Sequence, residues 1–242
     1  MSTKIIAHRG ASKLAPENTL PAFQLAYDLG ADGIETDVQL TKDQVPILIH
    51  DERLKRTTNG FGYVKDYTYQ ELKQLDAGSW FSISYANTPL LSLEEFLIWI
   101  KDKPLCLNIE LKNNKIDYKD LEKMVYTMLI DYQLLNRTTL SSFNPKSIKR
   151  MKKIDKRIDS AFLTSRRRKD LVAYAKSLGA HAIHVKYPLL SRKLVDRCNK
   201  EEIAIRIYTV NKALHIKRCF NLNCDGIFTD VPGKAINIAR KE

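Results

Sequence analysis

Short apolar segments recur along the chain, and amphipathic helical patterns separate most of them. A parallel sheet with helices packed outside it has this alternation. Eight such units in 242 residues predict an α/β fold, a closed (β/α)8 TIM barrel, which typically needs about 250 residues. Reactive groups would then lie at the C-terminal ends of the strands. The predicted strands are residues 4–8, 33–38, 105–111, 138–143, 158–164, 181–185, 204–210 and 226–229.

One segment interrupts this alternation after the second strand. Residues 39–44 alone separate it from the next apolar run, residues 45–50, and this connection is too short for a parallel crossover. We therefore expect a β-hairpin that returns His50 to the rim of the barrel. Residues 51–90 are rich in turn residues and aromatics, which predicts a small inserted region covering that rim. No shift in composition marks a second domain, so residues 1–242 are predicted to form a single domain.

Capping residues predict several helix boundaries. Asn18 is interpreted as the N-cap of a helix that runs to about Leu29 and ends at Gly30, and Ser92 as the cap of a helix through Ile100. Residues 119–134 carry apolar side chains at helical spacing, a stripe typical of core packing. Residues 170–178 and 191–200 are predicted to be helical for the same reason.

The chain shows no leader peptide and no run of about 18 apolar residues. We therefore expect a cytoplasmic protein without an integral membrane segment. The four cysteines lack metal-ligand spacing and are predicted to be free thiols in a reducing compartment.

The net charge of +12 would concentrate anionic substrates near the protein, and it equally suits loose binding to nucleic acid or to an acidic membrane. The densest run of cations, residues 166–169, has no interleaved aromatic residues on which bases could stack, so we interpret it as a solvated helix start. No nucleic-acid partner is predicted. The oligomeric state is left open.

Carboxylates recur on one side of two predicted strands. Glu35 and Asp37 lie two residues apart, as do Glu110 and Lys112, and side chains at this spacing face the same side of a strand. Three acids converging at the top of a barrel would repel one another unless a cation lies among them, and an all-oxygen set suits Mg²⁺ or Ca²⁺. The alternative is simple pairing of these acids with nearby Arg or Lys.

Two histidines end predicted strands, His8 at the first and His50 at the hairpin. Histidines titrate near neutrality and can exchange protons as general acid and base. Arg9 and Lys112 could neutralise an anionic substrate or pair with the carboxylates. The other histidines are interpreted as packing or surface residues: His181, His184 and His215.

An ordered set of motifs covers nearly the whole chain. Each is common alone, but in this order the set resembles the glycerophosphodiester phosphodiesterase family. The motifs are His8-Arg9-Gly10, Pro16-Glu17-Asn18-Thr19, Glu35-Thr36-Asp37-Val38, His50-Asp51 followed by Leu54, Arg56, Thr57 and Thr58, Glu110-Leu111-Lys112, Ser142-Phe143, Tyr208-Thr209-Val210-Asn211 and Asp225-Gly226-Ile227-Phe228-Thr229-Asp230-Val231-Pro232.

The resemblance implies a TIM barrel that hydrolyses a small glycerophosphodiester to sn-glycerol 3-phosphate and an alcohol. It implies one divalent cation, Mg²⁺ or Ca²⁺ with Mn²⁺ as a third option. Its implied site residues are Glu35, Asp37 and Glu110 for the metal, His8 and His50 as the acid and base pair, and Arg9 and Lys112 for the phosphate.

Glu17 is expected to support the metal or the substrate, or else to be a carboxylate at a helix start. Two departures from the family concern the pocket wall. Tyr208 stands where the family often has Trp, and residues 184–188 follow the family's pattern only loosely. The first should alter the wall and not the chemistry; the second leaves the preferred alcohol group open.

Two other functions are compatible with parts of this pattern. A related barrel phosphodiesterase acting on a lysophospholipid or another phosphodiester would share the metal site and the histidine pair. A non-catalytic protein that binds anions would need the cations, but it would gain nothing from three extra acids unless a metal were present.

Overall fold

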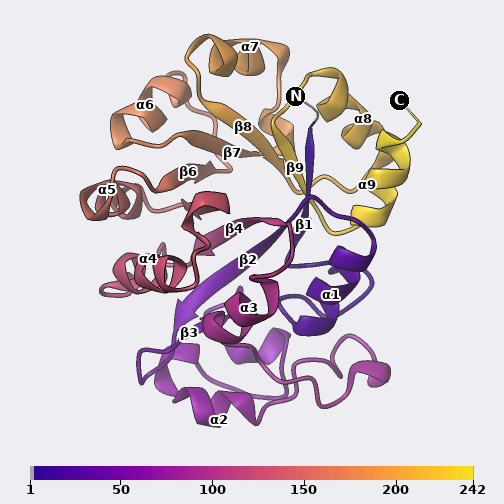
Figure 1. The fold of residues 1–242 in the computed structure, drawn as a ribbon, viewed down its shortest axis with the longest axis vertical. Helices are drawn as coiled ribbons and strands as arrows, with labels where there is room; N and C mark the ends of the chain where they lie inside the picture. The colour runs from indigo at the N-terminus through magenta and orange to yellow at the C-terminus, as the bar shows by residue number, and fades with distance from the viewer. Residues whose placement is uncertain (1–2, 242) are drawn as a thin grey trace.

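The computed structural model describes residues 3–241 and shows that the predicted TIM barrel is correct. Within these residues, eight parallel strands pair in chain order, and β1 pairs with both β9 and β2, which closes the barrel. Figure 1 shows the helices outside this ring of strands. The barrel strands are β1 (Lys4–His8), β2 (Gly33–Leu40), β4 (Cys106–Leu111), β5 (Thr138–Ser142), β6 (Asp159–Thr164), β7 (Ala182–Lys186), β8 (Ala204–Tyr208) and β9 (Gly226–Thr229).

The main core lies between the strands and the outer helices, where apolar side chains of both layers are buried together. The helix stripe predicted for residues 119–134 packs into this core, although α4 itself is shorter and ends at Asp131. Gln133 beyond it adopts a positive φ of 57°, which a helix cannot continue. The outer helices are α1 (Leu20–Asp28), α3 (Leu93–Ile100), α4 (Leu121–Asp131), α5 (Pro145–Ile154), α6 (Leu171–Leu178), α7 (Arg192–Lys200), α8 (Ala213–Asn221) and α9 (Pro232–Ala239).

The predicted hairpin and insertion follow β2. Strand β3 (Pro46–Leu48) runs antiparallel to β2, with Val38 opposite Leu48. The insertion then contains α2 (Tyr69–Lys73) and the 3₁₀ turns Leu54–Arg56, Val64–Asp66 and Ile83–Tyr85. It forms the lobe below the barrel in Figure 1. Its apolar residues make a small core of their own with those of β3: Ile47, Ile49, Leu54, Val64, Leu72, Ala77 and Leu90.

The helix caps are confirmed with one exception. Ser92 caps α3 in a capping box with Glu95, and Gly30, at φ +84°, follows the end of α1. The prediction that Asn18 caps α1 is wrong, because Thr19 occupies the N-cap position. Asn18 is buried instead, with φ +57°, and its side chain turns into the barrel.

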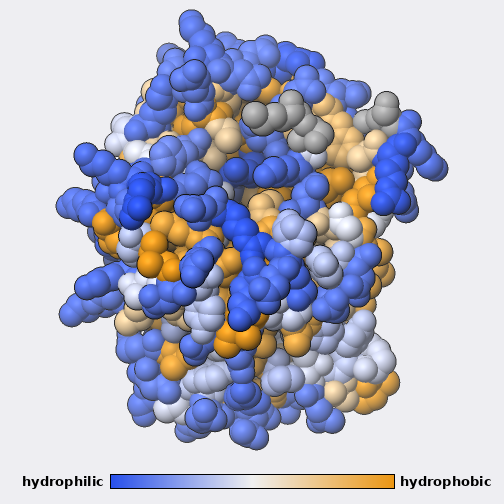
Figure 2. Space-filling model, in the orientation of Figure 1, coloured by the Kyte–Doolittle hydropathy of each residue, from blue (hydrophilic) through white to orange (hydrophobic). Residues whose placement is uncertain are grey.

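No helix in residues 3–241 combines the length and the apolar character that crossing a membrane requires. All four cysteines are free thiols. Figure 2 shows a largely hydrophilic face in which apolar residues form limited patches. The cationic run 166–169 is exposed and precedes α6, in agreement with its interpretation as a solvated segment.

The turn after β1 depends on a close approach of two backbone segments. Gly10 has φ +83°, and a Cβ added there would lie 2.6 Å from the carbonyl carbon of Ala22 in α1. The neighbouring amide of Ala11 donates to the carbonyl oxygen of Ala22. Glycine is therefore required twice at this position, for its left-handed backbone and for the space that a side chain would fill.

We expect Gly10→Ala to lower the free energy of unfolding by about 3 kcal/mol, because backbone strain adds to the clash with α1. Gly30→Ala is the matched control, since Gly30 has nearly the same φ but no atom within 4 Å of an added Cβ. It should cost about 1 kcal/mol, from strain alone. Urea unfolding of both variants measures the difference, and equal losses would show that the contact with Ala22 does not matter.

Candidate active site

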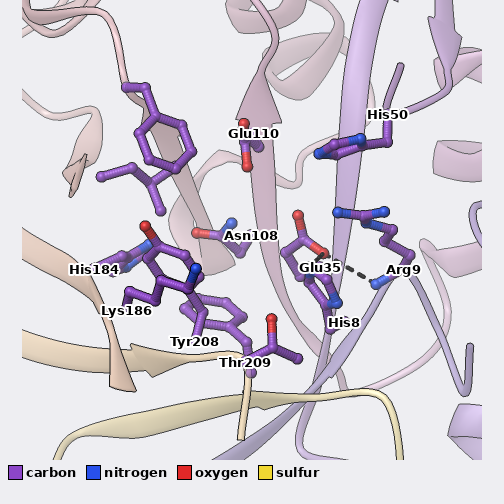
Figure 3. Close-up of a pocket in the computed structure, with 13 residues that line it drawn as sticks. His8, Arg9, Glu35, His50, Asn108, Glu110, His184, Lys186, Tyr208 and Thr209 are labelled. Atoms are coloured by element: carbon purple, nitrogen blue, oxygen red, sulfur yellow. Dashed lines mark hydrogen bonds and ion pairs between the residues drawn. The ribbon is translucent and has the colours of Figure 1, made fainter. Parts of the chain in front are cut away.

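A cavity of about 280 Å³ opens at the C-terminal ends of the barrel strands. Figure 3 shows that it has two different sides. His8, Arg9, Glu35 and His50 lie on one side, and His184, Lys186 and Tyr208 lie on the other. The remaining lining residues are Asn108, Glu110, Phe143, Leu163, Thr209 and Phe228.

The pairing of β2 with β4 brings the three predicted carboxylates together. Asp37 lies opposite Glu110 in the sheet register, and Glu35 lies opposite Asn108. One oxygen from each of Glu35, Asp37 and Glu110 can be chosen so that all lie within 4.8 Å of one another. The alternation predicted from the sequence is thus observed, and it aims all three acids into the barrel.

This cluster fits a divalent cation. Asp37 is fully buried, yet its Oδ1 atom has no hydrogen-bond partner. A buried carboxylate oxygen without a partner is costly unless a cation approaches it. Three carboxylates also form the hard, all-oxygen donor set that Mg²⁺ and Ca²⁺ prefer.

Two cations partly balance the carboxylates. Arg9 Nε lies 3.1 Å from Asp37 Oδ2, and Lys112 Nζ lies 2.8 Å from Glu110 Oε1 and 3.7 Å from Asp37 Oδ1. Pairing with Arg and Lys, the alternative to a metal site, is observed here, and it coexists with a carboxylate cluster that could hold a metal ion. A substrate phosphate next to the cluster would meet the same two cations.

The carboxylates respond to this environment in opposite ways. Burial and the negative charge of Asp37 raise the pKa of Glu35 well above its usual range. Burial alone would also raise the pKa of Asp37, but the charges of Arg9 and Lys112 lower it. Asp37 therefore stays ionised, while Glu35 holds a proton more readily until positive charge arrives.

Asn18 holds Asp37 in place. Its Nδ2 donates to Asp37 Oδ2 at 3.0 Å, and its Oδ1 accepts a hydrogen bond from Thr36 Oγ1 at 2.8 Å. All three side chains are buried. The amide thus orients a candidate metal ligand, a role that the cap interpretation missed because helix-start statistics carry no information about a neighbouring strand.

His8 is oriented by an aspartate from the far end of the chain. Its Nδ1 lies 2.7 Å from Asp230 Oδ1, and its Nε2 lies 4.0 Å from Glu35 Oε2. Asp230 in turn accepts hydrogen bonds from Ser12 and from Asn211. The pairing of β1 with β9, in which Ala7 faces Thr229, places the two residues next to each other.

His50 has its own aspartate, which follows it directly in sequence. His50 Nδ1 lies 2.6 Å from Asp51 Oδ1, and Arg56 Nε donates to Asp51 Oδ2 at 2.6 Å. Burial raises the pKa of Asp51, but the hydrogen bonds from Arg56 and His50 outweigh it and lower the pKa to about 2. Both histidines therefore share one pattern, with a carboxylate at Nδ1 and with Nε2 left for other contacts.

Glu17 links Arg9, which pairs with Asp37, to Arg56, which pairs with the His50 partner Asp51. Its carboxylate accepts hydrogen bonds from Arg9 Nη1 at 2.8 Å and from both terminal nitrogens of Arg56 at 2.8 and 2.7 Å. It precedes the first residue of α1, Leu20, so it is not a carboxylate of the first helical turn. On this side of the cavity, Glu35 lies between His50 and His8 (Figure 3).

The structure also finds site residues that sequence reasoning missed. Asp51 and Asp230 lay within motifs that had been recognised, but no chemical role was given to them. The adjacency of Asp51 to His50 was a usable signal, whereas the contact of Asp230 with His8 needs the barrel closure. His184, which was interpreted as a packing or surface residue, is fully buried and lines the cavity.

Comparisons with known proteins agree with this geometry. The model of the glycerophosphoryl diester phosphodiesterase family matches residues 8–234. A glycerophosphodiester phosphodiesterase of Caldanaerobacter subterraneus is 39% identical over 100% of this chain and 99% of its own, and one of Bacillus altitudinis is 40% identical over 98% of each. An Oleispira antarctica phosphodiesterase in complex with the product sn-glycerol-3-phosphate has a TM-score of 0.89 at 28% identity, covering 99% of this chain and 97% of that one.

The raised pKa of Glu35 predicts a pH dependence for the metal-free protein. The folded state holds this proton more tightly than the unfolded state, whose Glu titrates near 4.3. Stability should therefore fall as the pH rises from 5 to 7, by at most about 1.4 kcal/mol per pH unit. Glu35→Gln should lack this fall, and Mg²⁺ should stabilise the wild type but not the variant. Urea unfolding with EDTA at both pH values measures the effect, and parallel pH dependences would rule it out.

Proposed function

Because the chain belongs to the glycerophosphoryl diester phosphodiesterase family, we propose that it hydrolyses glycerophosphodiesters to sn-glycerol 3-phosphate and an alcohol. The observation that carries this proposal is the meeting of three carboxylates, two cations and two aspartate-bound histidines at the C-terminal end of the barrel strands, in and next to one cavity. The product complex of the Oleispira antarctica phosphodiesterase supports the same reaction.

The proposed reaction depends on a divalent cation, Mg²⁺ or Ca²⁺ with Mn²⁺ as a third option. Glu35, Asp37 and Glu110 would hold it, and their donor atoms fit this role as described above. Bound there, the cation would polarise a non-bridging phosphate oxygen. The fully buried Asp37 and its partner Asn18 would keep the donor set rigid.

Arg9 and Lys112 are the proposed phosphate contacts. Both already pair with the carboxylates, and their positive charge at the edge of the cluster can offset charge that develops on phosphate oxygens in the transition state. Glu17 fixes the guanidinium of Arg9 through a 2.8 Å hydrogen bond. We propose it as a supporting residue of the phosphate site.

His8 and His50 are the proposed acid and base pair. Each has Nδ1 against an aspartate, which leaves Nε2 to exchange a proton with substrate. One histidine would remove a proton from the nucleophile, either water or the glycerol 2-hydroxyl, and the other would protonate the leaving alkoxide. The same pair would serve both routes.

A non-catalytic anion-binding protein is a weaker alternative. Binding an anion would not require two histidines whose Nδ1 atoms are both fixed by carboxylates, nor a fully buried aspartate oxygen without a hydrogen-bond partner. These features have a cost in stability that binding alone does not explain.

Metal-stripped protein should release no glycerol 3-phosphate from glycerophosphoglycerol or glycerophosphocholine until Mg²⁺, Ca²⁺ or Mn²⁺ is added. His8→Ala and His50→Ala should each lower kcat by about 10²- to 10⁴-fold, because each removes a proton-transfer group. An enzymatic assay measures the glycerol 3-phosphate released, and circular dichroism checks that each variant is folded. A variant that keeps most of its turnover would remove that histidine from the mechanism.

Asp230→Asn tests the orientation of His8. It keeps the size of the side chain but removes the charge next to Nδ1, so we expect kcat to fall about 10- to 100-fold with little change in KM. Asp225→Asn is the control at the other end of β9, where Asp225 accepts a hydrogen bond from the amide of Ile205. It should leave kcat unchanged, and equal losses in both variants would point to a general effect on the barrel.

A further inference from the structure

The side of the cavity away from the catalytic residues has a different chemical character. It is built by Phe143 after β5, Leu163 of β6, His184 and Lys186 of β7, and Tyr208 of β8. The carboxylates that line the cavity within residues 3–241 are Glu35 and Glu110, and both belong to the metal-site cluster. We refer to the five residues Phe143, Leu163, His184, Lys186 and Tyr208 as the distal wall.

Three polar atoms at this side are buried and have no hydrogen-bond partner in the described part of the chain: His184 Nδ1, Tyr208 Oη and Asn108 Oδ1. Leaving such a group unpaired costs about 1–3 kcal/mol each. Three of them around one cavity indicate that a ligand supplies the missing hydrogen bonds.

The hydrogen-bonding character of each atom follows from its neighbours. Arg206 Nη1 lies 3.1 Å from His184 Nε2, and an arginine can only donate, so Nε2 accepts and the ring proton is on Nδ1. Burial also lowers the pKa of His184 well below its ordinary value, so the ring is neutral. Asn108 Nδ2 donates to Ser141 Oγ, which leaves its Oδ1 as an acceptor.

The distal wall therefore offers a donor at His184 and a hydroxyl at Tyr208 that can do either, and Asn108, which also lines the cavity, adds an acceptor. A hydroxyl group both donates and accepts, so a polyol is complementary to this set.

Lys186 is the charged residue of the distal wall. It is exposed at the end of β7, and the described residues include no hydrogen bond or ion pair to its ammonium group. Figure 3 shows it beside His184 and Tyr208, across the cavity from Arg9 and His50. Its positive charge is therefore not neutralised by a neighbouring acid.

We propose that the distal wall binds the alcohol arm of the diester, that its polar atoms select a hydroxylated alcohol such as glycerol or inositol, and that Lys186 excludes alcohols that carry an ammonium group. The inference rests on the proposed reaction, since it assigns the second arm of the same substrate. It names a substrate class that the family relationship leaves open.

An ammonium group would find no counterpart on this wall. Recognition of such a group needs a carboxylate or an accessible aromatic face. The rings that line the cavity pack against one another, Phe143 with Tyr208 edge to face at 6.1 Å between centroids and His184 with Phe228 at 4.8 Å, and a lysine stands beside them. At a separation of about 7 Å and an effective dielectric between those of surface and water, repulsion by Lys186 would weaken binding of a cationic arm about tenfold.

Calorimetry can test this on the metal-loaded His50→Ala protein, so that neither diester is consumed. This protein should bind glycerophosphoglycerol at least tenfold more tightly than glycerophosphocholine. Adding Lys186→Gln should lower the ratio of the two Kd values about tenfold, and Lys186→Glu should lower it further. Lys193→Glu is the matched control, because Lys193 is an exposed cation of α7 that does not line the cavity. It makes the same charge change and should leave the ratio as it was.

Tyr208→Phe tests the hydroxyl contribution separately. It should weaken binding of glycerophosphoglycerol about tenfold without lowering the thermal stability, since the hydroxyl has no partner in the free protein. A structural role would instead lower the stability and leave the affinity unchanged.

The two proposals fail in different ways. Unchanged Kd ratios in the Lys186 variants, or no binding of either diester, would overturn the selectivity inference. Tight, selective binding of glycerophosphoglycerol without turnover by the wild type would uphold this inference and refute the proposed reaction.

Discussion

The fold of this chain is arranged around a buried group of three carboxylates that two cations only partly balance. Arg9 and Lys112 contact Asp37 and Glu110, and they do so from positions that the backbone fixes closely. Arg9 itself adopts φ +58°, its amide donates to Glu35, and the next residue is the glycine that packs against α1. Charge of one sign concentrated in a low dielectric is costly, so the segments that carry these groups must be held firmly by the barrel.

The contacts around the cluster connect segments that are far apart in sequence. Closure of the barrel brings Asp230 to His8, while the hairpin brings His50 to the same cavity. Glu17 and Arg56 then link the first loop to the insertion. Because each histidine is oriented by a different segment, the proposed acid and base pair requires both the closed barrel and the docked insertion.

Much of the fold was predictable because it depends on local patterns. Apolar runs gave the strands nearly to the residue, and the alternation of side chains predicted that Glu35, Asp37 and Glu110 face inward. The wrong cap at Asn18, and the contacts of Asp230 and His184 that were not foreseen, concern residues whose partners lie in other strands. Asparagine is a residue type that often caps helices, but the side-chain amide of Asn18 instead bonds to the buried Asp37 carboxylate and the Thr36 hydroxyl of the neighbouring β2. Asp230 and His184 become site residues only through the register of β9 with β1 and of β7 with β8, which a single sequence does not specify.

The separate small core of the insertion has a consequence for the integrity of the site. Cores that do not share side chains can melt as distinct cooperative units, each with its own free energy of opening. The insertion carries Asp51 and Arg56, follows His50 directly, and is tied to the barrel side by polar contacts such as that between Lys73 and Glu95. Its opening would leave the barrel and its three carboxylates folded, while His50, one of the two residues proposed for proton transfer, would lose its partners Asp51 and Arg56. The protein is therefore expected to lose its activity on heating before it loses its fold.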